Sequence, residues 1–234
     1  MYKGKKKAVT FSYDDGVTQD IRLIRLFDKY AVKATFNLNS DRFGREEPIS
    51  WEGRSAQHNT VRAEDVKHIY EGHEVAGHTL THPNLTALGE PEIIRQVEED
   101  RQRLSQLAGY EVAGMAYPGG GVNCDDRVER VIREHTGIRY GRTGNASHSF
   151  APQENLLRFR PTVHHHCEWE KMHALAEEFL TLEAEEPALL YIWGHSYEFD
   201  FYDQWKEFEE FLEHISRRTD IFYGTNAQVL LETE

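Results

Sequence analysis

The stretch Glu74-Val-Ala-Gly-His78-Thr-Leu-Thr-His82-Pro83 is the one around which this sequence is organised. His78 and His82 stand four residues apart, which can place both imidazoles on one side of a helical turn or tight loop and suits one shared metal ion. Pro83 disfavours the helical region for the residue before it, so His82 is expected to end the turn. The lead-in Glu74-Val75-Ala76 predicts a short strand. Because the chain has 13 histidines, the pair needs support from the remaining sequence.

Composition describes an acidic globular protein. The chain has 234 residues, 39% of them hydrophobic and 29% charged, which is enough for one large α/β domain or at most two small ones, and one domain over residues 1–234 is expected. A net charge of −13 argues against nucleic acid as a partner. No apolar run approaches a membrane span, and the basic start Met1–Lys7 precedes no apolar signal core, so no membrane partner and a cytoplasmic location are expected of the chain as given. Cys124 and Cys167 cannot form a disulfide framework, which fits a reducing compartment.

Strands and helices are predicted to alternate about seven times along the chain. The expected strands are 7–13, 33–38, 74–76, 114–117, 139–142, 157–161, 188–193 and 221–223, and the expected helices are 19–30, 63–71, 91–108, 125–135, 169–182 and 203–217. Ile21, Leu23, Ile24 and Phe27 would form the apolar side of the first helix, and Gly137 would cap the helix 125–135. This alternation indicates a parallel sheet with crossover helices.

Residues 39–62 have no clear periodicity and are predicted to be a loop. A loop of this length in a compact domain is usually functional or mobile. Phe43, Trp51 and His58 lie in it, and they either line a substrate groove or pack against the rim of the domain.

Polar groups recur immediately after the predicted strands. They are Asp14-Asp15, His78 and His82, Tyr117-Pro118-Gly119, Arg142 and His195. Chemistry in parallel α/β sheets is located at the carboxyl ends of the strands. Asp14 and Asp15 would point to opposite faces of a regular strand, so they share a site only if the chain turns there, as Gly16 permits.

These residue types are typical of a catalytic metal centre. Two histidines and one carboxylate form a three-ligand site with an open position for water. A second aspartate can then act as a base toward that water, and a distant histidine can act as an acid.

Four motifs carry a more specific signal: Tyr13-Asp14-Asp15-Gly16, His78-Thr-Leu-Thr-His82, Ala116-Tyr117-Pro118-Gly119 and Leu189-Leu-Tyr-Ile-Trp-Gly-His195. In this order they resemble the motifs of the polysaccharide deacetylases with a NodB homology domain, carbohydrate esterase family 4. The resemblance runs from about residue 7 to the C-terminus. It implies a deformed (β/α) barrel of about seven parallel strands.

The resemblance also implies roles for individual residues. Asp15, His78 and His82 would bind one divalent metal ion, Asp14 would be the base on a metal-bound water, and His195 would be the acid that protonates the leaving amine. The backbone N–H of Tyr117 would help hold the oxyanion. The ion is expected to be Zn²⁺, although Co²⁺, Ni²⁺, Mn²⁺ and Fe²⁺ also fit these ligands. The candidate substrate-binding residues are Tyr117, Pro118, Gly119, Arg142 and Trp193.

The sequence departs from the family pattern in three places. Ala116 stands where the family commonly has an arginine that orients the base, and Val17 follows Asp-Asp-Gly where a proline is common. The fourth family motif, with its Asp and Trp, has no good match, and Tyr140-Gly-Arg142-Thr143 occupies that region. Arg142 is the candidate source of the missing positive charge. These changes leave the metal site intact and bear on the substrate.

Several features have a plainer interpretation. Asp14-Asp15 alone would be a turn and helix N-cap, and His195 alone a histidine satisfied at a strand end. Pro118-Gly-Gly-Gly121 lacks the Lys-Ser/Thr of a phosphate-binding loop. The run His164-His165-His166-Cys167-Glu168 suggests metal chemistry, but adjacent residues rarely chelate one ion, which favours a surface loop. Four residues either contact substrate or pack: Arg142, Trp193, Tyr197 and Glu198.

The leading functional hypothesis is a metal-dependent hydrolase of a non-peptide C–N bond that removes acetyl from an N-acetylated sugar. The alternative on the same fold is a cytoplasmic hydrolase of a small cyclic amide, ureide or acylamine, which Ala116 and the missing export signal favour. A third hypothesis, an inactive carbohydrate-binding module, is disfavoured because such a module has no need of a complete Asp-His-His set.

Overall fold

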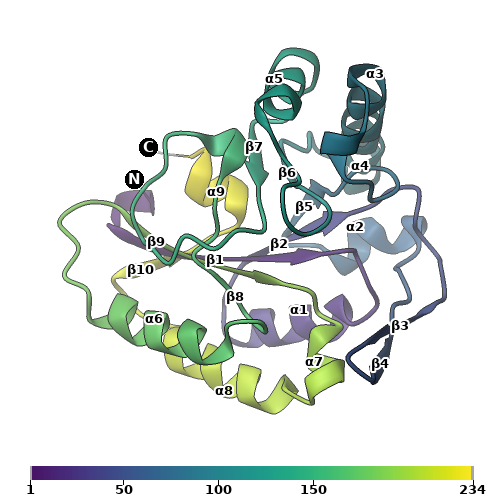
Figure 1. Ribbon diagram of the computed structural model, residues 1–234. Helices are drawn as coiled ribbons and strands as arrows, with labels where there is room; N and C mark the ends of the chain where they lie inside the picture. The colour runs from purple at the N-terminus through teal and green to yellow at the C-terminus, as the bar shows by residue number, and fades with distance from the viewer. Residues whose placement is uncertain (1, 233–234) are drawn as a thin grey trace.

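A sheet of eight parallel strands forms the centre of the computed structural model, which describes residues 2–232 (Figure 1). The strand order is β7-β6-β5-β2-β1-β9-β8, and β10 pairs with β1 beside this path. The strands are β1 Lys7–Asp14, β2 Ala34–Leu38, β5 Glu74–Gly77, β6 Gly114–Ala116, β7 Tyr140–Arg142, β8 Val163–His164, β9 Ala188–Gly194 and β10 Ile221–Tyr223. The seven strands of the path form a half-barrel, which confirms the expected deformed (β/α) barrel.

Strand β1 is the central strand. Residues 7–13 of β1 pair with β9. On its other side, residues 7–9 of β1 pair with β10 and residues 11–14 pair with β2. Every residue of β1 is buried. The apolar residues Val9, Phe11 and Tyr13 alternate with Thr10 and Ser12, whose side chains are buried on the other face of the strand. These polar side chains are hydrogen-bonded there: Thr10 donates to the Asn226 side chain at 2.9 Å, and Ser12 accepts from Asn37 at 2.9 Å.

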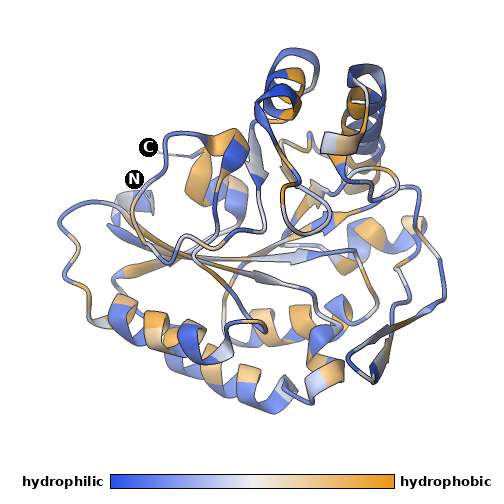
Figure 2. Ribbon diagram, in the orientation of Figure 1, coloured by the Kyte–Doolittle hydropathy of each residue, from blue (hydrophilic) through white to orange (hydrophobic). Residues whose placement is uncertain are grey.

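Helices pack outside the sheet, and each shows both apolar and polar residues along its length (Figure 2). Their bounds are α1 Asp20–Lys29, α2 Val66–Ile69, α3 Glu90–Ile94, α4 Asp100–Ala108, α5 Asp126–His135, α6 Trp169–Thr181, α7 Glu198–Tyr202, α8 Trp205–Ile215 and α9 Asn226–Leu230. In Figure 1, α1, α6 and α8 lie together below the sheet, and α3, α4 and α5 lie at the upper right. Leu23, Ile24 and Phe27 of α1 are buried as predicted, but Ile21 is 37% exposed because it points away from the sheet.

The predicted helix 91–108 contains a π-helical turn. Helices α3 and α4 are continuous through Arg95–Glu99, which has the wider π geometry. The extra residue in this turn changes which side chains face inward, so Ile93, Val97 and Leu104 are buried while the predicted Ile94 is only partly buried.

Two further predictions about secondary structure are wrong. Residues 157–161 are not a strand: Leu156–Arg158 forms a 3-10 turn, only Phe159 bridges to Arg142, and the strand beside β9 is β8, which follows Pro161. Proline has no N–H for a sheet ladder, so pairing begins after it. Gly137 is not a left-handed cap, since Thr136 ends α5; a Cβ on Gly137 would instead lie 2.5 Å from the Arg101 guanidinium carbon.

The predicted loop 39–62 contains a β-hairpin, and two short helices were not predicted. Strands β3 Pro48–Trp51 and β4 Arg54–Gln57 pair antiparallel and lie apart from the main sheet. Helix α7 follows β9 directly, and α9 lies near the end of the chain. Among the helices of residues 2–232, none is both long enough and apolar enough to cross a membrane.

Candidate active site

The polar groups that were predicted at strand ends lie at the carboxyl edge of the sheet. Asp14 is the last residue of β1 and Arg142 the last of β7, while His78, Tyr117 and His195 follow β5, β6 and β9 directly. Parallel strands place all their carboxyl ends at one edge. A cleft of about 1040 Å³ opens there, and Asp14, His78, Tyr117 and His195 are among its lining residues.

Asp14 and Asp15 share this site because the chain leaves the strand geometry between them. Asp15 has a φ of 77° and Gly16 a φ of 65°, both in the left-handed region. A non-glycine residue in this region costs on the order of 1–3 kcal/mol. The turn predicted at Gly16 therefore begins one residue earlier, at Asp15, whose carboxylate now points to the same cleft as that of Asp14.

The loop that carries His78 and His82 is held by the π-helical turn. The carbonyl of Gln96 accepts the N–H of Leu80 at 3.0 Å, and the Gln96 side chain accepts the N–H of Thr81 at 3.1 Å. The wider π turn frees such groups from the helix, which is one reason π turns occur at functional sites. Asp100 accepts the N–H of His78 at 3.1 Å. His82 has a φ of 65°, outside the right-handed helical region, as Pro83 predicts.

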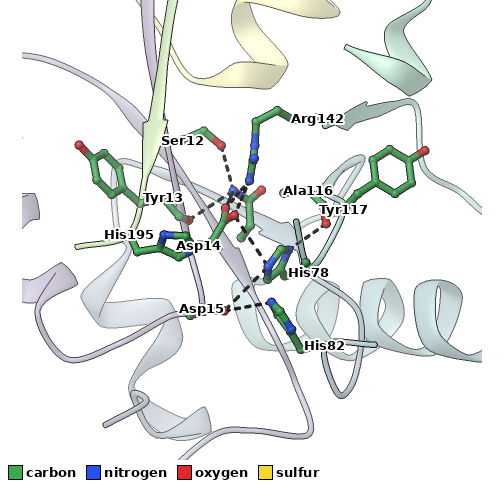
Figure 3. A network of polar contacts seen from close by, with 12 residues as sticks. Ser12, Tyr13, Asp14, Asp15, His78, His82, Ala116, Tyr117, Arg142 and His195 are labelled. Atoms are coloured by element: carbon green, nitrogen blue, oxygen red, sulfur yellow. Dashed lines mark hydrogen bonds and ion pairs between the residues drawn. The ribbon is translucent and has the colours of Figure 1, made fainter. Parts of the chain in front are cut away.

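Asp15, His78 and His82 converge as a metal site would require (Figure 3). Asp15 Oδ1 lies 3.8 Å from His78 Nε2 and 3.7 Å from His82 Nε2, too far for hydrogen bonds. Ligand atoms 2.0–2.1 Å from a tetrahedral ion lie roughly 3.4 Å from one another. Burial lowers the pKa of His82 to about 4, so its ring is neutral and has a free lone pair at neutral pH.

The tautomer of His78 also fits a metal ligand. Its Nδ1 lies 2.9 Å from the carbonyl oxygen of Ala116, which can only accept a hydrogen bond. The proton is therefore on Nδ1, and Nε2 presents its lone pair to the space beside Asp15. A divalent cation fits these three residues.

His58 supports the same group from the foot of the hairpin. Its Nε2 lies 3.0 Å from Asp15 Oδ2, the carboxylate oxygen that does not face His78 and His82. Burial raises the pKa of Asp15, but the hydrogen bond from His58 and the positive charge of His195 outweigh this effect and hold that pKa far below its ordinary value. The sequence placed His58 only in an irregular loop, and no spacing signal connects it with Asp15.

Arg142 is the partner of Asp14. One guanidinium nitrogen, Nη2, lies 2.5 Å from each Asp14 oxygen (Figure 3). The Asn37 side chain donates to Asp14 Oδ1 at 2.8 Å. Burial raises the pKa of Asp14, but Arg142 outweighs burial and the pKa is lowered. Asp14 is therefore a carboxylate at neutral pH even though it is only 2% exposed.

The position of Arg142 agrees with the expectation that it supplies the positive charge missing at Ala116. Ala116 of β6 and Arg142 of β7 are paired residues in the parallel register. Paired residues of neighbouring strands point to the same face of a sheet, so the adjacent strand can present a guanidinium at the same level. Arg142 is only 1% exposed, does not line the cleft, and packs 4.2 Å from the Trp193 ring centre. Its predicted contact with substrate is corrected to a contact with Asp14.

The predicted oxyanion donor is already engaged. The backbone N–H of Tyr117 donates to the carbonyl of Arg142 at 2.9 Å, because the β6–β7 pairing extends one residue past β6. Its hydroxyl donates to the carbonyl of Leu157 at 2.7 Å. Tyr117, Gly119 and Trp193 line the cleft, whereas Pro118 is not among its lining residues.

His195 lies next to a group that the sequence did not connect with it. Its Nδ1 is 3.3 Å from Glu198 Oε1, and His164 Nε2 is 3.6 Å from the same oxygen. The surface loop expected for the histidine run is wrong for His164 and His165, which are 7% and 0% exposed. They are buried because β8, absent from the predicted strands, carries His164 into the sheet.

The β3–β4 hairpin forms one wall of the cleft. Trp51 stands at its turn and is 64% exposed, and both Trp51 and His58 line the cleft. Phe43 packs against the main hydrophobic core instead. Tyr197, Phe201 and Tyr202 line the cleft from α7 and the residue before it.

Comparison with known proteins gives one family. The family model for polysaccharide deacetylase matches residues 2–140. The chain is 31% identical over 64 residues to the peptidoglycan-N-acetylmuramic acid deacetylase PdaC of Bacillus subtilis, a match that covers 27% of this chain and 14% of that protein. It is 29% identical over 110 residues to the peptidoglycan-N-acetylglucosamine deacetylase of Bacillus cereus, covering 45% of this chain and 34% of that protein. The matches thus span about a seventh and a third of these relatives.

Solved structures share the fold over nearly the whole chain. The Xyl-CE4 domain of a multidomain xylanase from the hindgut metagenome of Trinervitermes trinervoides has a TM-score of 0.61 at 14% identity, covering 97% of this chain and 91% of that one. A T48 deacetylase with substrate has a TM-score of 0.60 at 16% identity, covering 100% of this chain and 95% of that one. At these identities the likeness concerns the fold alone.

Proposed function

The chain belongs to the polysaccharide deacetylase family, and from this premise we propose that it is a metal-dependent hydrolase that removes acetyl from an N-acetylated sugar or oligosaccharide. One observation carries the proposal. Asp14 and His195 line the same cleft as the Asp15, His78 and His82 group, so a base, an acid and a metal-binding set face one space.

Asp15, His78 and His82 are the residues that would hold the ion. When bound, a divalent cation supplies Lewis-acid polarisation of the amide carbonyl and lowers the pKa of water. The ligand set suits Zn²⁺, and Co²⁺, Ni²⁺, Mn²⁺ or Fe²⁺ can also bind it.

Asp14 is the proposed base. It accepts a proton from the water that attacks the acetamide carbon. Arg142 and Asn37 keep Asp14 ionised and fix its orientation, leaving its charge available toward the cleft at neutral pH. A base that is held in position before the reaction avoids the cost of ordering it during the reaction.

His195 is the proposed acid. When the C–N bond breaks, the departing amine needs a proton, since an unprotonated amide nitrogen is a poor leaving group. Burial lowers the pKa of His195, but the charge and hydrogen bond of Glu198 raise it to about 9. His195 is therefore protonated at neutral pH, and the products are acetate and the free amine.

The test is acetate release from short N-acetylglucosamine oligomers by the purified protein, with and without a strong chelator. We expect release that stops with chelator and returns when zinc is added. Absence of release from protein that carries about one ion per chain would remove the sugar substrate and direct the search to small cyclic amides. Release that is indifferent to chelator in metal-free protein would contradict metal dependence.

Trp51 provides a separate test of substrate size. An exposed aromatic ring at a cleft edge can stack on the apolar face of a sugar, and large exposed apolar groups commonly mark binding sites. For Trp51→Ala we expect KM for an oligomer to rise several-fold, while kcat stays unchanged because Trp51 does not contact the proposed base or acid. Steady-state kinetics on a long and a short substrate measure this effect. A KM that is unaffected for every substrate length would place the substrate away from the hairpin.

A further inference from the structure

His195 belongs to a second group of potential metal ligands. His164, His195 and Glu198 each present one ligand atom within 4.8 Å of the others, as Asp15, His78 and His82 do. Residue types and distances alone do not distinguish the two groups. Their hydrogen bonds do.

The tautomer of His164 is opposite to that of His78. His164 Nδ1 accepts the backbone N–H groups of His166 and Cys167, both at 3.1 Å. A nitrogen that accepts hydrogen bonds carries no proton, so the proton of the neutral ring is on Nε2. Burial lowers the pKa of His164 to about 4, which keeps the ring neutral. The Nε2 that faces Glu198 is thus an N–H donor without the lone pair that a metal requires.

Glu198 receives donors from several directions. Its Oε2 accepts the backbone N–H of His195 at 2.9 Å, and His165 Nε2 lies 3.5 Å from the same oxygen. Its Oε1 faces His164 Nε2 and His195 Nδ1. Burial raises the pKa of Glu198, but the interactions with His164 and His195 outweigh this effect and lower that pKa far below its ordinary value. Glu198 is therefore an ionised, largely buried carboxylate that can accept hydrogen bonds from the surrounding N–H groups.

The other histidine of this group is His195, whose Nδ1 faces Glu198. Within residues 2–232, its Nδ1 is buried and has no hydrogen-bond partner that meets strict geometry, and Glu198 Oε1 is the acceptor facing it. Such bonds are often long in the absence of substrate and shorten in the reactive complex. A proton on Nδ1 that points to Glu198 leaves Nε2 as the nitrogen available to the cleft.

We propose that Glu198 is the positioning residue of His195, with the Nε2–H of His164 facing the same Glu198 oxygen from 3.6 Å, and that this group, which we call the relay, orients the acid and is no second metal site. The proposal rests on the proposed function for the role of His195, but not for the tautomers. Glu198 selects the ring orientation in which Nδ1–H of the imidazolium points to the carboxylate and the acidic Nε2–H is presented to the leaving amine.

A charged partner also determines the pH range in which His195 is an acid. The ionisable groups around His195 are Glu198 of α7, Asp14 and Asp15 at the end of β1, and His164 and His165 at β8. The three carboxylates favour the imidazolium, and the two histidines are neutral because burial lowers their pKa values. Loss of the Glu198 charge should therefore lower the pKa of His195.

The main test is Glu198→Gln, which keeps the shape but adds an N–H₂ donor where donors already converge. We expect kcat to fall on the order of 10- to 100-fold with KM unchanged, and the alkaline limb of the kcat profile to move to lower pH. Metal content should stay at that of the wild type. The matched control is Glu177→Gln, which removes an exposed glutamate paired with His214 and should change none of these quantities.

A measurement on the wild type separates this proposal from the proposed function. Nitrogen-15 spectra of the imidazoles, assigned with His164→Gln and His195→Gln, report tautomers whether or not the substrate is known. We expect Nε2–H on His164 and a proton on Nδ1 of His195. A His164 protonated on Nδ1, or two ions per chain of which one is lost in both His164→Gln and Glu198→Gln, would overturn the relay. Correct tautomers without acetate release would leave the relay standing and remove only the sugar deacetylase.

Discussion

Asp14→Asn is expected to lower kcat by on the order of 10³-fold while the protein keeps its fold and its metal ion, since general base catalysis commonly contributes 10²- to 10⁴-fold. The asparagine oxygen can still accept hydrogen bonds from Arg142 or Asn37, but the amide cannot accept the proton of the attacking water. Asp14 is outside the group formed by Asp15, His78 and His82, so metal content should not change. Steady-state kinetics and metal analysis on the same preparation measure both effects.

The neighbouring residue is the matched control for this prediction. Asp15→Asn should lose metal. In the carboxylate, one oxygen faces His78 and His82 and the other contacts His58, and the asparagine keeps only one oxygen for these two sides. Asp220→Asn, which affects an exposed carboxylate paired with Lys7, should change neither activity nor metal content. Unchanged turnover in Asp14→Asn would show that the base is another residue. Loss of metal in Asp14→Asn, with retention in Asp15→Asn, would exchange the two roles.

Arg142→Met is expected to reduce both stability and activity. It leaves Asp14 buried without its cation, and breaking a buried pair in this way typically costs about 3–5 kcal/mol of the free energy of unfolding. We also expect kcat at neutral pH to fall by on the order of 100-fold, as Asp14 loses a fixed position and part of its charge. Urea unfolding and a pH–rate profile test the two effects.

The direction of the pH effect follows from the pKa of Asp14. Arg142 lowers that pKa, so the base in the wild type stays ionised well into the acid range. Without Arg142 the pKa rises, and the acid limb of the rate profile should move to higher pH. A lowered native pKa adds stability above the ordinary value of 3.8 that is lost as the pH falls. The stability deficit of Arg142→Met should therefore be larger at pH 8 than at pH 4.

A second substitution tests whether an arginine at position 116 on β6 can replace Arg142 on β7. Ala116 and Arg142 are register partners, so Ala116→Arg combined with Arg142→Met places the family arginine opposite the vacated position. We expect the double variant to recover a large part of the lost activity and to return the acid limb toward that of the wild type. An unaltered acid limb in Arg142→Met would contradict the role of Arg142 toward Asp14.

The parallel sheet and the edge at which its polar residues gather can be predicted from the order of residues along the chain. Strand 188–193 is apolar throughout because both of its faces are covered, and strand 7–13 is rich in β-branched and aromatic residues; both properties are visible in a linear sequence. The residues directly after each strand follow it to the same edge. Asp14, Asp15, His78, His82 and His195 could therefore be assigned to one site before any coordinates were known.

Tertiary structure alone decided which of these groups contact one another and in which protonation state. Arg142 pairs with Asp14, and Glu198 with His195 and His164, because β7, β8 and α7 meet β1 and β9 at this edge. Strands as short as β8, with two residues, carry too little periodicity to be predicted, so the burial of His164 was missed. Tautomers depend on single backbone donors and acceptors brought together from separate segments. Sequence spacing records the types of ligand, whereas only the folded hydrogen-bond network distinguishes a histidine prepared for a metal from one that positions an acid.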